Sequence, residues 1–131
     1  MRRRDLLAGL LATTTTATAP WAAEQNRVHR LAVCSQFGMD SFAETYWILL
    51  FNRLAQMGFT EGKNLIVDRY ATEGRPERYE ELARKIVQAK PDVIAIGFDH
   101  QFIMQVAKET TAIPLVATFG DLVAAGIVKT I

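Results

Sequence analysis

The segment GRPERYEELARKIVQAKPDVIAIGF, residues 74–98, predicts a helix that is followed directly by a buried strand. Pro76 suits the first turn of such a helix, and Pro91 cannot continue it, so the two prolines bracket the helical part. One face of the helix is apolar at three- and four-residue spacing, through Tyr79, Leu82, Ala83, Ile86 and Val87. Residues 93–98 are apolar on both faces, which is typical of a central strand in a parallel sheet.

Short apolar runs alternate with helical patterns along the rest of the chain. Further strands are expected at residues 28–33, 65–70 and 114–119, and a further helix at about 101–109. Asp121 is expected to cap a last short helix. Strands that alternate with helices predict an α/β fold in which a parallel sheet is flanked by helices.

Between the first two strands the sequence predicts a helix that begins at a cap on Asp40 or Ser41 and ends before Gly58, which favours a left-handed stop. The stripe expected to be buried on this helix is Phe42, Tyr46, Leu49, Leu50, Leu54 and Met57. Trp47 and Phe51 form a second apolar stripe, which we also expect to pack against a neighbouring element.

The first 23 residues, MRRRDLLAGLLATTTTATAPWAA, predict an export signal that is separate from the fold. Three arginines precede a modest apolar run, and the order Arg3-Arg4-Asp5-Leu6-Leu7 is typical of a twin-arginine signal. The run is too short and too rich in threonine for a membrane span. The alternative is a disordered basic terminus on a cytoplasmic protein. The export hypothesis places the mature protein, residues 24–131, in the periplasm and leaves the cleavage position open.

The charge of residues 24–131, which we expect to form one domain, argues against nucleic acid as a partner. Three of the 15 Lys and Arg residues and one of the 14 Asp and Glu residues lie in the first 23, which leaves a net charge of −1. Cys34 is a single cysteine within an apolar run, so we expect a buried, inert thiol. His29 and His100 have no companions at metal-ligand spacing, so neither a metal nor another cofactor is expected.

Three stretches carry a resemblance to a known family. They are LAQMGFTEGKNLIVDRY (54–70), EGRPERYEELARKIVQAKPDVIAIG (73–97) and TTAIPLVATFGDLVAAGIV (110–128). Together they resemble the ABC-transporter substrate-binding proteins of the kind that includes tryptophan and tyrosine importers. The turn from Gly58 to Asn64 is the most specific part of the resemblance, which extends from about Val28 to the end of the chain.

The resemblance implies the type I periplasmic binding protein fold, in which two Rossmann-like lobes joined by a hinge enclose a ligand. On this hypothesis the chain is the partial N-terminal lobe, because members of the family are more than twice as long. The implied partners are a small solute, such as an apolar or aromatic amino acid, and the permease and ATPase subunits of an ABC importer. Members of the family commonly carry an export signal.

The ligand is expected at the carboxyl ends of the strands, where ligands gather in open α/β sheets. The residues that follow the strands there are Ser35, Gln36, Phe37, Phe98, Asp99, His100, Phe119 and Asp121. Three phenylalanine rings at one edge suit an apolar or aromatic side chain, while Ser35, Gln36 and helix-end amides suit a carboxylate.

Each of these residues also has a simpler interpretation. Phe98 and Phe119 can complete the core at the ends of their strands. Asp99 and Asp121 can serve as helix caps. His100 can be an exposed loop residue.

No motif in the sequence indicates an enzyme. There is no G-x-S-x-G, no Walker loop and no G-x-G-x-x-G after a strand. Asp40, Asp99 and Asp121 at strand ends leave one enzymatic alternative, a receiver-like or hydrolase site on a flavodoxin-like sheet. A further alternative is an extracytoplasmic ligand-sensing module that uses the same lobe.

Overall fold

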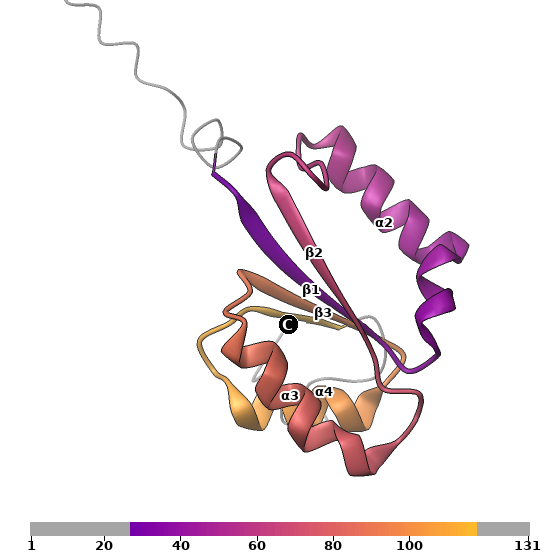
Figure 1. Ribbon diagram of the computed structural model, residues 1–131, viewed down its shortest axis with the longest axis vertical. Helices are drawn as coiled ribbons and strands as arrows, with labels where there is room; N and C mark the ends of the chain where they lie inside the picture. Colours follow the sequence, from indigo (N-terminus) through magenta and orange to yellow (C-terminus); the bar gives the residue numbers. More distant parts are fainter. Residues whose placement is uncertain (1–26, 118–131) are drawn as a thin grey trace, which may run out of the picture.

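The computed structural model describes residues 27–117, in which four parallel strands form one sheet with helices on both faces (Figure 1). The strands are β1 (His29–Ser35), β2 (Leu65–Ala71), β3 (Val93–Gly97) and β4 (Leu115–Ala117). The helices are α2 (Thr45–Gln56), α3 (Tyr79–Gln88) and α4 (His100–Glu109), with short 3-10 turns η1 (Met39–Ala43) and η2 (Pro76–Arg78). The predicted parallel α/β fold is confirmed.

The strand order is β2-β1-β3-β4, so β1 and β3 are the two central strands. From β1 the chain moves outward to β2, and it then crosses back over β1 to β3 and β4. Because such crossovers are right-handed, the reversal of direction sends α2 to one face of the sheet and α3 and α4 to the other. Figure 1 shows this division of the helices.

The α3 and α4 face holds the larger hydrophobic cluster. Ala32 and Cys34 of β1 and Ile94 and Ile96 of β3 point to this face. The helices cover them with Tyr79, Leu82, Ala83, Ile86, Phe102, Ile103 and Val106. The stripe predicted for the helix after Pro76 is therefore confirmed at its four most N-terminal positions, which are all buried.

The α2 face is built around aromatic rings. Val33 and Ala95 pack there against Phe42 and Trp47, whose ring centroids are 5.1 Å apart. Phe51 stacks on Trp47, and the Arg69 guanidinium lies 4.9 Å from the centroid of the Phe51 ring. Trp47 is buried, as the sequence predicts.

The start of α2 differs from the prediction. The expected helix from Asp40 or Ser41 is broken into η1 and α2 by Glu44, whose backbone is extended at φ −77° and ψ 156°. The hydroxyl of Ser41 bonds to Gly38 O at 2.7 Å instead of capping a helix.

This break also changes which side of the helix is buried. A single helix would place Phe42 on the same stripe as the residues that follow it. In the structure Leu49 is 62% exposed and Met57 is 51% exposed, so the prediction that both are buried is wrong. Tyr46, Leu50 and Phe51 do pack against the cluster on this face.

The turn between α2 and β2 is closed by Asn64. Gly58 and Gly62 have φ values of 94° and 88°, in the left-handed region that glycine adopts without strain. Asn64 Oδ1 accepts from Thr60 N at 2.8 Å, and Asn64 Nδ2 donates to Gly58 O at 2.8 Å. His29 N then donates to Asn64 O at 2.8 Å, which joins this turn to the start of β1.

The polar side chains of the described core are satisfied. No buried side-chain nitrogen or oxygen within residues 27–117 lacks a hydrogen-bond partner. In that same range no helix is both long enough and apolar enough to cross a membrane. The predicted last helix capped by Asp121 and the end of the fourth predicted strand lie outside the described residues.

We expect the Cys34 thiol to be unreactive in the folded protein. Burial, with a smaller contribution from the Asp99 carboxylate, raises the pKa of this thiol, and the thiolate is the reactive form. Iodoacetamide should therefore label the native chain far more slowly than it labels glutathione, and should label it readily after unfolding in guanidinium. Mass spectrometry measures both rates. Native labelling as fast as that of glutathione would contradict the buried position of Cys34.

Candidate functional site

The candidate site lies where β1 and β3 end side by side. The chain leaves β1 toward β2 and leaves β3 toward β4, so the connections diverge where these two strands end. Open α/β sheets bind ligands at such a point. Phe37 follows β1 and is 52% exposed, and Phe98 follows β3 and is 42% exposed. Both predicted phenylalanines are therefore accessible at this edge of the sheet.

Phe98 has an unusual backbone conformation. Its φ is 61°, in the left-handed region that a bulky residue seldom adopts. Its ring meets the Tyr46 ring edge-on at a centroid distance of 5.5 Å. The Tyr46 ring in turn meets Trp47 at 5.0 Å, which ties this contact to the buried aromatic cluster.

Asp99 is 5% exposed, and both of its carboxylate oxygens are engaged. Phe102 N donates to Oδ1 at 3.0 Å, so the side chain caps α4. Oδ2 accepts from Thr72 Oγ1 and from Tyr79 OH, each at 2.8 Å. The structure thus places Asp99 at the centre of a buried hydrogen-bond network, where it serves as the helix cap that the simpler interpretation predicts.

Ser35 holds the loop that follows β1. Its hydroxyl is buried, accepts from Phe37 N at 3.1 Å and shares a hydrogen bond with Ser41 Oγ at 2.8 Å. Gln36 lies half-buried between Ser35 and Phe37. These contacts fix the backbone that carries Phe37.

The other predicted site residues are placed less centrally. His100 is exposed, as its simpler interpretation predicts, but it is the first residue of α4 and does not lie in a loop. Phe119 and Asp121 lie outside the described residues, so their part in the site stays a prediction. Tyr46 was missed because its spacing matches the core stripe of α2. The signal that could have indicated Tyr46 is its position in the first turn of α2, because this turn follows β1 and lies at the same edge of the sheet as Phe98.

An acidic site does not assemble in the described part of the chain. Asp40 is exposed, whereas Asp99 is buried with its oxygens engaged. Residues 27–117 contain no group of three or more His, Cys, Asp or Glu side chains that could hold a metal ion.

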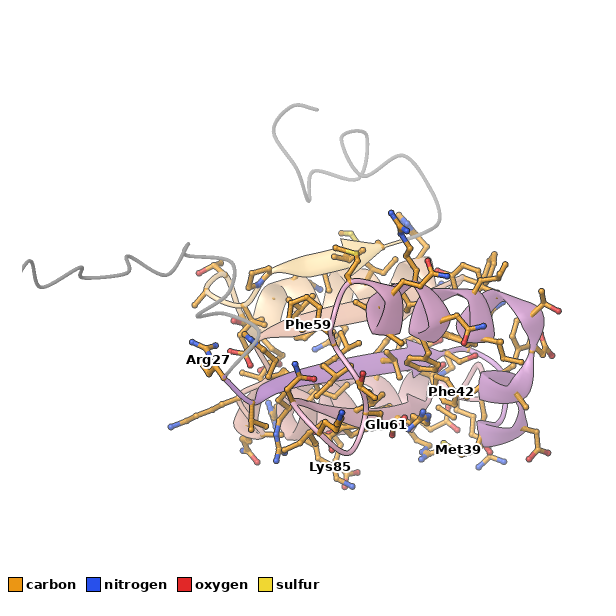
Figure 2. The ribbon with its side chains drawn as sticks, turned by 90° about the horizontal axis from the view of Figure 1, so that it is seen from above. Arg27, Met39, Phe42, Phe59, Glu61 and Lys85 are labelled. Carbon is orange, nitrogen blue, oxygen red and sulfur yellow. The ribbon has the colours of Figure 1, made fainter. Side chains whose placement is uncertain are left out.

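A hollow lies under α2, at the end of the sheet opposite the candidate site. Its volume is about 320 Å³. The residues that line it are His29, Arg30, Leu31, Leu50, Leu54, Phe59, Leu65, Asp92, Val93, Ala95 and Val116. Figure 2 shows Phe59 and Arg27 near this end, and Met39 and Phe42 at the end where the candidate site lies. No sequence pattern predicted this hollow.

Comparison with known proteins supports the fold. No protein-family description and no curated protein matches the sequence significantly. A solved structure of a conserved domain protein from Vibrio cholerae O1 biovar eltor is 28% identical, with a TM-score of 0.69 over 79% of this chain. A substrate-binding protein with adhesive properties from Clostridium difficile, in a ligand-free, open structure, is 24% identical, with a TM-score of 0.68 over 79% of this chain.

The chain corresponds to 35% of the length of each of these two structures. The described sheet and helices therefore share their fold with one part of each of these two proteins.

Tyr79 gives the site network a pH dependence. Burial and the hydrogen bond to Asp99 raise the pKa of its phenol to about 12, whereas the pKa of an unfolded tyrosine is 10.0. Above pH ~10 the unfolded chain loses this proton first, so this contribution to stability is complete below that pH and is lost as the pH rises toward ~12.

We expect the stability difference between the wild type and Tyr79→Phe to shrink at alkaline pH. At pH ~8 the variant should be less stable by about 1 kcal/mol, because Asp99 loses one buried hydrogen bond. At pH ~11 the wild type also bears the cost of keeping the phenol protonated, so the difference should fall by about 1 kcal/mol. Urea unfolding followed by circular dichroism measures both values. Cys34 and the other tyrosines are present in both proteins, so their titration cancels in the comparison. An equal stability difference at the two pH values would contradict the raised pKa of Tyr79.

Proposed function

We propose that this chain forms one wall of a binding site for a small solute, in an extracytoplasmic substrate-binding protein of an ABC importer. The observation that carries the proposal is the pair of exposed rings, Phe37 and Phe98, at the carboxyl ends of β1 and β3, where the connections diverge. Open α/β sheets bind ligands at this position. A substrate-binding protein among the solved structures with the same fold supports a binding role over catalysis.

An apolar or aromatic amino acid is the solute that we propose. The rings of Phe37, Phe98 and Tyr46 would surround its side chain, since aromatic walls favour apolar and aromatic groups. Gln36 and the backbone amides of the loop after β1 would hold its carboxylate. The Ser35 hydroxyl, which is already bonded within the loop, would act by fixing those amides. Phe119 and Asp121 would extend the site beyond β4.

The permease and the ATPase of an importer are the proposed protein partners, and the periplasm is the proposed location. The chain spans about a third of the length of the solved structures that it resembles. Two-lobed binding proteins bury their ligand between lobes, so the contacts proposed here are one side of the site. We therefore expect this chain to bind its solute weakly.

Replacing Phe98 with alanine should remove solute binding at this edge. The probes are L-phenylalanine, L-tryptophan and L-leucine, titrated into the ¹⁵N-labelled chain by NMR, which detects weak binding. In the wild type, amide shifts should concentrate in residues 35–37 and 98–100. Loss of a ring that anchors a ligand costs about 2 kcal/mol, or roughly 30-fold in affinity, so Phe98→Ala should show no measurable shifts.

Leu49→Ala is the matched control for this test. Leu49 is also an exposed apolar side chain, but it lies on the outer side of α2, so its removal should leave the shifts unchanged. If none of the three probes shifts residues at this edge in the wild type, the solute-binding proposal is wrong. Equal shifts in Phe98→Ala and the wild type would exclude the aromatic wall.

Replacing both Arg3 and Arg4 with lysine should block export. The twin-arginine hypothesis depends on this pair, so the precursor should accumulate in the cytoplasm. Cell fractionation and immunoblotting measure the distribution, and Arg2→Lys, which leaves the pair intact, is the control. An unchanged periplasmic yield for the double variant would contradict export by this route.

A further inference from the structure

The carboxyl edge of the sheet is crossed by a connected set of hydrogen bonds. Thr72, directly after β2, donates through its backbone N to Ser35 O at 2.9 Å, which joins the ends of β2 and β1. The Thr72 hydroxyl donates to Asp99 Oδ2, which joins both to the end of β3. Tyr79, the first residue of α3, donates to the same oxygen. One buried carboxylate thus connects four elements beneath the candidate site.

The backbone that carries each exposed ring is connected to this network. Phe37 N is bonded to the hydroxyl of Ser35, whose carbonyl accepts from Thr72. Phe98 immediately precedes Asp99 in the chain. Neither ring is part of the main hydrophobic clusters, so packing alone does not fix the backbone that carries them.

The left-handed backbone at Phe98 needs a compensating interaction. This conformation is unfavourable in a residue with a side chain, and it persists only where the surroundings over-determine it. The surroundings include the contact of the ring with Tyr46 and the three hydrogen bonds to the carboxylate of Asp99. These hydrogen bonds fix Asp99, the residue that follows Phe98. Gly97, which precedes Phe98, has no side chain to hold the backbone from the other side.

We infer that Tyr79 and Thr72 are positioning residues for the site. By holding the carboxylate of Asp99, they keep Phe98 in its left-handed conformation, with its ring against Tyr46 at the ligand-binding edge. The effect of this network on solute affinity rests on the proposed function. Its effect on the conformation of Phe98 does not. The rings of Phe98 and Tyr46, held in this way, form a rigid wall that suits a flat or bulky apolar side chain. The entropy cost of ordering this wall is met during folding and not during binding.

Tyr79→Phe isolates the positioning effect. The variant keeps the ring that packs edge-on against Phe102 at 5.2 Å and removes only the hydroxyl. We expect the ¹³C and amide resonances of Phe98 to move away from left-handed values or to broaden, and the nuclear Overhauser contacts between the Phe98 and Tyr46 rings to weaken. Unchanged resonances and contacts would overturn the inference, with or without a ligand.

Tyr70→Phe is the control for loss of a tyrosine hydroxyl. Tyr70 lies on β2, packs on the same face of the sheet as Tyr79, and is outside the Asp99 network. Its substitution should leave the Phe98 resonances in place. Equal changes in both variants would show a general loosening of the fold and would also overturn the inference.

A double-mutant cycle with L-phenylalanine as the probe tests the link to binding. In the wild-type background Tyr79→Phe should lower the affinity roughly threefold to tenfold, the effect expected for one hydrogen bond. In a Phe98→Leu background, which keeps an apolar side chain at this position, it should lower the affinity no further, because the ring through which Tyr79 acts is absent. Additive losses would overturn the role in binding. Failure of L-phenylalanine and the other probes to bind the wild type would count against the proposed function, while the NMR comparison would still decide the positioning role.

Discussion

β1 pairs with β2 on one side and with β3 on the other, and the rest of the described structure depends on this double pairing. Both neighbours are parallel to β1, in continuous register from Leu31 onward. The chain runs outward from β1 to β2 and then back past β1 to β3, and because both crossovers are right-handed, α2 lies on one face and α3 and α4 on the other. The connections also diverge at the carboxyl ends of β1 and β3, where Phe37 and Phe98 are exposed.

Polar backbone groups that follow these strand ends are satisfied by side chains. Asp99 caps α4, and Ser35 binds the amide of Phe37. Thr72 and Tyr79 complete the coordination of the Asp99 carboxylate. A buried carboxylate with fewer partners would be costly, so the network stabilises the fold and shapes the loops at the same time.

The sequence predicted the features that depend on local spacing. The buried stripe of α3, the parallel strands and the cap at Asp99 all follow from residues close together in the chain. The break between η1 and α2 could not be predicted, because it depends on Ser41 meeting Ser35 from another element. The conformation of Phe98 likewise depends on partners that the fold brings to Asp99, and its contact with Tyr46 joins two distant segments. Such long-range contacts leave no periodic trace in a sequence.

The position of these rings explains how an exposed loop can present a defined surface. Loops carry binding residues because they lie at the surface, but a mobile loop loses affinity when a ligand orders it. Here Phe98 follows a buried strand and precedes a buried cap, and Tyr46 is tied to the buried Trp47. The rigid scaffold therefore extends to the base of each ring, and only the ring faces are left to meet a partner. That combination of exposure and fixed geometry is what a binding surface requires.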